Sequence, residues 1–106
     1  MAAQTYWITF HIKDVNTAKG DYSARYKALT QAIFEMSDGY WPEPTSFILF
    51  STDKSAAEII AAIKGAIQSS VDLVVLGMPS VKRFDVIGAT AHLDVIQSLV
   101  DFAKKV

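Results

Sequence analysis

The chain has 106 residues, of which 51% are hydrophobic, and a formal net charge of -1. Its length predicts one domain, residues 1–106, around one core, and its charge balance excludes a broad attraction to nucleic acid or anionic lipid. It has no cysteine, which excludes disulfides, thiol catalysis and cysteine-ligated metal sites. The apolar surplus of so small a domain predicts a buried subunit interface.

The first ten residues, MAAQTYWITF, have no basic start and no long apolar run. This segment therefore does not resemble a signal peptide, and no stretch of the chain is apolar enough to span a membrane. We expect a cytoplasmic protein with no membrane partner.

Residues 6–14 read YWITFHIKD and predict a half-buried strand, because apolar side chains alternate with a mixed set. His11 belongs to the mixed face, between Thr9 and Lys13. A strand that is polar on one side favours a sheet with one open face.

A loop, VNTAKGD, is expected to lead into a helix over residues 22–36. Asp21 is placed to cap this helix, since its carboxylate can accept from free backbone N–H groups of the first turn. Helical spacing predicts two faces. The core-facing side chains are expected to be Tyr22, Tyr26, Leu29, Ile33 and Met36, and the water-facing ones Arg25, Lys27, Gln31 and Glu35.

The segment from residue 37 to 46 contains two prolines, and it leaves room for a short strand in a hairpin with the next one. Residues 47–50, FILF, are apolar on both faces, as a central strand would be. Ser55 and Glu58 form a capping-box pattern at the start of a second helix. Gly65 inside that helix costs about 1 kcal/mol against alanine and is expected to allow close packing.

Residues 72–78, DLVVLGM, predict another strand buried on both faces, and FDVIGA predicts a further short strand after a turn. Thr90 is expected to cap a last helix over HLDVIQSLVDFAKK. Lys104 and Lys105 would then lie at its C-terminal end, where the helix dipole favours cations. Its expected apolar stripe comprises Leu93, Ile96, Leu99, Val100 and Ala103.

This order of elements fits two architectures. The first is an α+β ferredoxin-like sandwich, with helices on one face of an antiparallel sheet and an extra C-terminal helix. The alternative is a small flavodoxin-like α/β fold with a parallel sheet covered on both faces. The half-polar first strand and the lack of a glycine-rich turn after it favour the first.

Several segments together resemble a known group of proteins: YWITFHIKD, GDYSARYKALTQAI, YWPEPTSFILFSTDKSAAEI and SSVDLVVLGM. They are similar to small bacterial proteins related to the CRISPR-associated Cas-two family, including a SinR-like group. The matching positions lie within about residues 5 to 78. They are Gly20, Asp21, Tyr22, Trp41, Thr52, Asp53, Ser55, Ala56, Glu58, Ile59 and Asp72 to Val75.

The resemblance implies a ferredoxin-like fold and a homodimer packed through the open sides of two sheets. For the nucleases of the family it also implies a metal-bound aspartate at the end of the first strand, where this chain has His11. Magnesium prefers anionic oxygen ligands, which an imidazole does not supply. No cofactor is therefore expected, and magnesium would be needed only if a divergent nuclease activity survives.

His11 and Asp14 are the candidate catalytic residues. His11 is either a general base or ligand that faces a dimer cleft, or a hydrogen-bonded histidine on a sheet surface. Strand alternation places Asp14 on the opposite face, which argues against an acid–base pair. His11 and His92 would need further ligands to hold zinc, so no metal site is expected.

Trp7, Tyr40 and Trp41 are candidate stacking surfaces for a ligand, or interface residues, and the apolar surplus favours the interface. Lys13, Lys82 and Arg83 would bind phosphate if they converge.

The function expected is therefore a non-catalytic homodimeric interaction or nucleic-acid-associated module, with at most weak binding to nucleic acid. A metal-dependent endonuclease that uses Asp14 is one alternative. A small-molecule sensor with a dimer cleft lined by Trp7, His11 and Trp41 is another.

Overall fold

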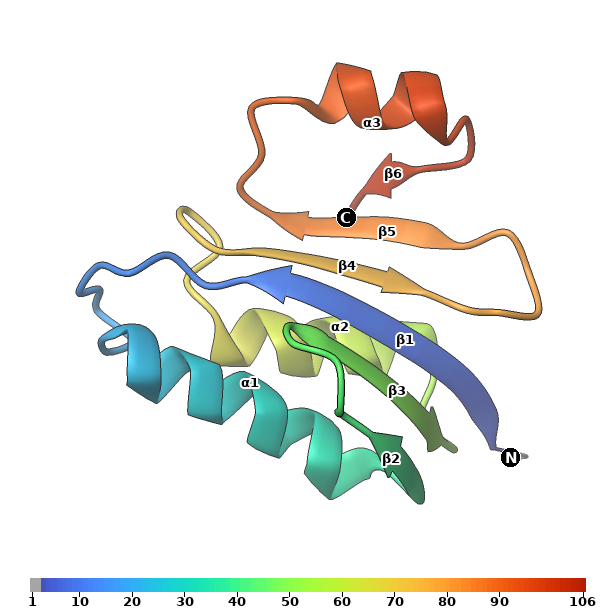
Figure 1. The fold of residues 1–106 in the computed structure, drawn as a ribbon, viewed down its shortest axis with the longest axis horizontal. Coiled ribbons are helices and arrows are strands. Elements are labelled where there is room, and N and C mark those ends of the chain that lie inside the picture. Colours follow the sequence, from blue (N-terminus) through green and yellow to red (C-terminus); the bar gives the residue numbers. More distant parts are fainter. Residues whose placement is uncertain (1–2) are drawn as a thin grey trace.

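The computed structural model describes residues 3–106, which form one six-stranded sheet and three helices (Figure 1). The elements are β1 (Gln4–His11), α1 (Tyr22–Met36), β2 (Gly39–Trp41), β3 (Phe47–Thr52), α2 (Ala56–Ala66), β4 (Leu73–Gly77), β5 (Phe84–Gly88), α3 (Leu93–Leu99) and β6 (Lys104–Lys105). The strand order is β2-β3-β1-β4-β5-β6. Every neighbouring pair is antiparallel except β5 and β6. The α+β prediction is confirmed, and the parallel flavodoxin-like alternative is wrong.

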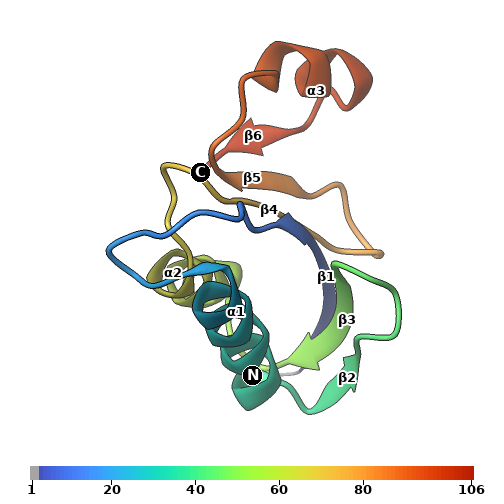
Figure 2. The same ribbon diagram turned by 60° about the vertical axis from the view of Figure 1, so that its left-hand side comes forward.

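The hydrophobic core lies between α1, α2 and one face of the sheet, which curves over the two helices (Figure 2). Alternate residues of each central strand point into it, as the period of two requires. Burying each of these large side chains contributes on the order of 1.5–3 kcal/mol. The strands contribute Ile8, Phe10, Ile48, Phe50, Val74 and Leu76, and the helices Leu29, Ile33, Ile59 and Ile63.

Both predicted helix caps are present. The Asp21 carboxylate accepts a hydrogen bond from the backbone N–H of Ala24 at 2.9 Å. Ser55 and Glu58 satisfy each other's backbone N–H groups in a capping box. These bonds fix where α1 and α2 begin, since the first N–H groups of a helix have no partner inside it.

Two side chains of α1 lie where they were not expected. Tyr22 is 39% exposed and does not belong to the core, whereas Arg25 is completely buried instead of facing water. The buried stripe of the helix is Arg25, Leu29 and Ile33, a spacing of four residues. Arg25 occupies this stripe because a buried carboxylate, that of Asp72, pairs with it.

The hairpin prediction is confirmed, because β2 pairs with β3, and β3 pairs on its other side with β1. The prediction that Gly65 allows close packing is wrong. A Cβ built at this glycine meets no atom within 4 Å.

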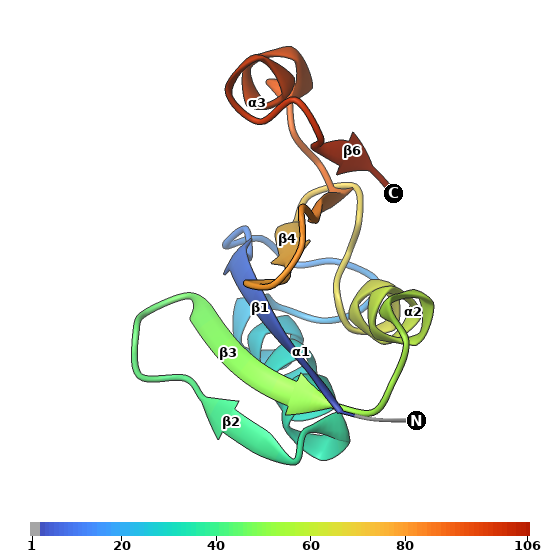
Figure 3. The same cartoon turned by 90° about the vertical axis from the view of Figure 1, so that its right-hand side faces the viewer.

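The C-terminal segment differs from the sequence prediction. The last helix is short and begins at Leu93, after His92. Thr90 does not cap it, because its hydroxyl accepts from the N–H of His92 and not from a residue of the helix. Its predicted stripe is only partly realised, since Leu99 is 80% exposed. Lys104 and Lys105 form β6 instead of ending a helix, and β6 pairs with the edge of β5 that would otherwise be open. Figure 3 shows α3 beyond this end of the sheet, away from α1 and α2.

Candidate functional site

The face of the sheet opposite α1 and α2, here called the open face, carries an almost uncharged set of side chains. The register places Trp7 of β1 beside Leu49 of β3 on one side and beside Gly77 of β4 on the other. Trp41 of β2 lies opposite Leu49, and Phe84 of β5 lies opposite Gly77. One cross-strand row therefore runs over five strands, with a tryptophan at its centre.

Four aromatic rings of the open face are in contact, and we call them the open-face cluster: Trp7, Trp41, Phe47 and Phe84. The ring of Trp7 stacks on Phe47 with centroids 6.3 Å apart and meets the edge of Phe84 at 6.0 Å. Trp41 makes an edge contact with Phe47 at 6.4 Å. Such pairs contribute about 0.5–1.5 kcal/mol each beyond their burial.

Gly77 makes the space that the central tryptophan occupies. A Cβ built at this glycine would lie 2.2 Å from Cζ2 of Trp7, far inside van der Waals contact. The indole therefore lies directly over the backbone of β4, between Phe47 and Phe84. Trp7 and Trp41 were expected from the sequence as ligand or interface residues, whereas Phe47, Gly77 and Phe84 were not, because their place in this row depends on strand register.

The open-face cluster is incompletely covered by the rest of the chain. Trp41 is 45% exposed, and Trp7, Phe47 and Phe84 are half-buried. By contrast, Val75 of β4 and Val86 of β5, which pair with each other on the same face, are buried. One carboxylate borders the cluster, since the indole N–H of Trp41 donates to Glu43 at 3.3 Å. A partly exposed aromatic patch with so little charge is typical of an interaction surface.

His11 lies at the end of β1 on the open face, as the alternation predicted, and its side chain is exposed. A hollow of about 150 Å³ next to it is lined by Thr9, Phe10, His11, Leu73 and Val75. Within residues 3–106 no hydrogen bond or ion pair joins the imidazole to an acid that could orient it. In the described part of the chain, His11 therefore lacks the orienting partner that a general base commonly has.

Asp14 does not lie on the same strand as His11. β1 ends at His11, and Asp14 lies exposed in the following loop. No three His, Asp or Glu side chains of the described chain gather closely enough to hold a metal ion. Since an imidazole does not supply the anionic oxygen that magnesium prefers, the residues at the end of β1 do not fit a magnesium site.

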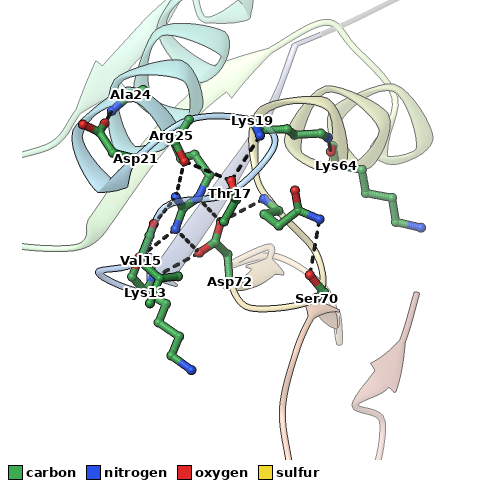
Figure 4. Close-up of polar contacts among 12 residues, drawn as sticks. Lys13, Val15, Thr17, Lys19, Asp21, Ala24, Arg25, Lys64, Ser70 and Asp72 are labelled. Carbon is green, nitrogen blue, oxygen red and sulfur yellow. Dashed lines mark hydrogen bonds and ion pairs between the residues drawn. The ribbon is translucent and has the colours of Figure 1, made fainter.

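A second feature, not predicted from the sequence, is the buried ion pair of Arg25 with Asp72, which lies against the loop after β1. The guanidinium of Arg25 uses all five of its N–H groups (Figure 4). It donates twice to the Asp72 carboxylate, at 2.9 and 3.1 Å. The other three bonds go to the backbone carbonyls of Lys13, Val15 and Gly20, at 2.6 to 2.8 Å.

The Asp72 carboxylate is equally satisfied, because it also accepts from the backbone N–H groups of Lys13 and Gln68. Burial raises the pKa of this carboxyl, but the hydrogen bonds from Arg25 and from the two backbone groups outweigh burial and hold the pKa below its usual value. The hydrogen bond to Asp72 likewise raises the pKa of Arg25.

The Arg25–Asp72 pair joins segments that are distant in the sequence: α1, the loop after β1, and the turn before β4. The carbonyl of Asp72 also accepts from the N–H of Ala89 after β5. Lys19 adds a further link by donating to the carbonyls of Lys64 and Gly65 at the end of α2. Since every N–H group of Arg25 is used within the chain, the pair is a structural clamp and offers no donors to a ligand.

The remaining candidates are dispersed. Tyr40 lies on the helix side of β2 against Phe34, with ring centroids 5.3 Å apart, and so does not share a face with Trp7. Burial raises the pKa of Tyr40. Lys13 follows β1, whereas Lys82 and Arg83 lie in the loop between β4 and β5.

The strand register separates these basic residues. His11 pairs with Leu73 at one end of β4, and Trp7 pairs with Gly77 at the other, so the two loops lie at opposite ends of the sheet (Figure 1). Arg83 is also engaged by Asp85 in an ion pair. The structure therefore does not bring the three basic residues together into one phosphate site.

No protein-family model, no curated protein and no solved structure matches the chain. What the Cas-two-like resemblance implies thus stays a prediction. Among the helices formed by residues 3–106, none is long and apolar enough to cross a membrane.

Proposed function

We propose that this chain is a non-catalytic interaction module and that two copies associate through their open faces. The observation that carries the proposal is the open-face cluster, whose four aromatic rings remain partly exposed in a single copy. Large aromatic side chains are enriched in interfaces, where their burial supplies much of the binding free energy.

A second copy is the occupant that this surface favours. The four rings carry no formal charge, and the carboxylate beside them, that of Glu43, lies at the outer ring Trp41. The rings can therefore face their copies across a two-fold axis without repulsion between them. The hydrophobic content of 51% is at the upper end of the ordinary range for a chain of 106 residues, which also favours a further buried surface.

We further propose a ferredoxin-like fold of the Cas-two-like type, extended by β5, α3 and β6. The support is the connection β1-α1-β2-β3-α2-β4 together with the spatial order β4-β1-β3-β2, in which each helix crosses over one intervening strand. His11 in place of the family aspartate supports a role without metal-dependent cleavage.

Weak binding of single-stranded nucleic acid is the second candidate, and the same four rings favour it. Aromatic side chains on an open sheet can stack successive bases without reading their sequence. The separation of Lys13 from Lys82 leaves few phosphate contacts beside these rings, so we rank this candidate below self-association.

Tryptophan fluorescence tests the proposal directly, because both tryptophans of the chain, Trp7 and Trp41, belong to the open-face cluster. Self-association predicts emission from buried indole at high protein concentration and a shift toward longer wavelength on dilution. Phe47→Thr, which removes the ring between the two indoles, should show exposed emission at every concentration.

Phe34→Ala is the matched control, since Phe34 is a 57% exposed aromatic residue on α1, away from the open face. This variant should behave as the wild type does. Emission from exposed indole at all wild-type concentrations would contradict self-association. Quenching of such a monomer by single-stranded oligonucleotides would instead favour the nucleic-acid candidate, and no quenching would exclude both.

A further inference from the structure

A hollow of about 250 Å³ lies between the first turns of α1 and the turn that connects β2 with β3. It shares no residue with the open-face cluster. Its lining residues are Tyr22, Ser23, Tyr26, Thr45 and Ser46.

Every residue that lines this hollow carries a hydroxyl group, and none carries a formal charge. Within residues 3–106 these five hydroxyls take part in none of the hydrogen bonds that hold the fold. Each can donate one hydrogen bond and accept others. The hollow therefore offers several free donors and acceptors but no attraction for an ion.

The aromatic wall of the hollow is held in place. The rings of Tyr22 and Tyr26 have centroids 5.8 Å apart, and Tyr26 meets the edge of the core residue Phe10 at 5.6 Å. Tyr22 is 39% exposed, so part of its ring surface is free to contact another molecule.

The opposite wall contains a strained residue. Ser46 has a φ of 56°, in the left-handed region that residues other than glycine rarely occupy. Its carbonyl accepts from the N–H of Phe10 at 3.1 Å and from Oγ1 of Thr9 at 3.0 Å, and these bonds hold the conformation. Strain that the surrounding structure maintains is often found at binding sites.

We propose that this hollow binds a neutral sugar ring, from a free saccharide or from the ribose of a nucleoside. Sugar rings combine apolar C–H faces, which pack on tyrosine, with several hydroxyls that match those of the serine and threonine side chains. The absence of charge in the lining disfavours anionic and cationic ligands. The volume admits about one ring, because pockets for larger ligands span roughly 300–1,000 Å³.

The test is a titration of ¹⁵N-labelled full-length protein, followed by the backbone amide signals in NMR spectra. Methyl glucoside probes the free saccharide, uridine probes the ribose, and glycerol controls for a polyol without a ring. We expect saturable shifts confined to residues 22–26 and 45–46 with at least one of the two ring compounds, and none that saturate with glycerol.

Variants separate binding from folding. Tyr22→Ala should weaken the binding about tenfold, equivalent to about 1.4 kcal/mol, because the sugar loses one of its two tyrosine contacts. Ser46→Gly should weaken it while relieving the left-handed strain. Phe34→Ala, on the same helix, should bind as the wild type does. No saturable shift with either ring compound, or an equal response in Tyr22→Ala, would overturn the proposal.

Discussion

Arg25 and Asp72 form an ion pair at 2.9 Å in which neither side chain is exposed to solvent. The pair does more than neutralise two charges, because both groups also bond to the backbone of the loop after β1. This loop begins where the open face ends at His11. The clamp thereby connects the position of the open face to that of α1 and β4.

Removing one partner of the clamp should be strongly destabilising. Asp72→Asn leaves a buried guanidinium without its counter-charge and should lower the free energy of unfolding by about 3–5 kcal/mol. Urea unfolding measures this loss. Asp53→Asn, at an exposed carboxylate, should change the value by less than about 0.5 kcal/mol. Equal losses in the two variants would show that the clamp contributes nothing of its own.

The clamp should also make stability dependent on pH on the acid side. The pKa of Asp72 is lower in the folded chain than its ordinary value of 3.8. The unfolded chain therefore takes up a proton first as the pH falls, which favours unfolding. The contribution of Asp72 is fully present well above pH 3.8 and is lost as the pH falls toward the folded pKa.

Unfolding free energies measured on both sides of this value test the assignment. The difference between the wild type and Asp72→Asn should shrink as the solution becomes more acidic than pH 3.8. A difference that stays constant through this range would mean that another carboxyl, such as Glu58, whose pKa is also lowered, dominates the acid response.

Gly77→Ala should disturb the open-face cluster without removing any of its rings. The new methyl group would overlap the indole of Trp7, so the ring must leave its place over β4. Overpacking of this kind typically costs about 1–3 kcal/mol. We expect reduced stability together with changed tryptophan emission. Unchanged emission would contradict the position of the indole.

Gly65→Ala is predicted to act in the opposite direction. The glycine lies within α2, is exposed, and has free space around the position of a Cβ. Alanine should therefore raise the free energy of unfolding by about 1 kcal/mol through its higher helix propensity. Thermal unfolding would show this increase, and a lower midpoint would reveal a packing role that the structure does not contain.

The elements that could be predicted from the sequence are those with local signals. Alternation marked β1, and capping residues marked the starts of α1 and α2, because these patterns depend on neighbours within a few residues. The C-terminal helix was predicted too long, since its apolar spacing continues to Ala103. Pairing with the free edge of β5, a long-range contact, turns Lys104 and Lys105 into a strand instead.

The candidate site was less predictable, because it depends on register and burial. Trp7 was recognisable as an aromatic residue on the mixed face, but its contacts with Phe47 and Phe84 follow from pairings across three other strands. Arg25 was expected to face water with Lys27, Gln31 and Glu35, but it is buried. Its spacing of four residues from Leu29, and of eight from Ile33, is the signal in the sequence that indicated burial.

The most direct test of the central claim is the molar mass of the purified chain in solution, measured by light scattering over a range of concentrations. Association through the open face predicts twice the monomer mass of 11.6 kDa for the wild type. It predicts the monomer mass for Phe47→Thr, with Phe34→Ala remaining dimeric. A wild-type mass of one chain at every concentration, or a dimer unaffected by Phe47→Thr, would contradict the claim that the open face is the interface.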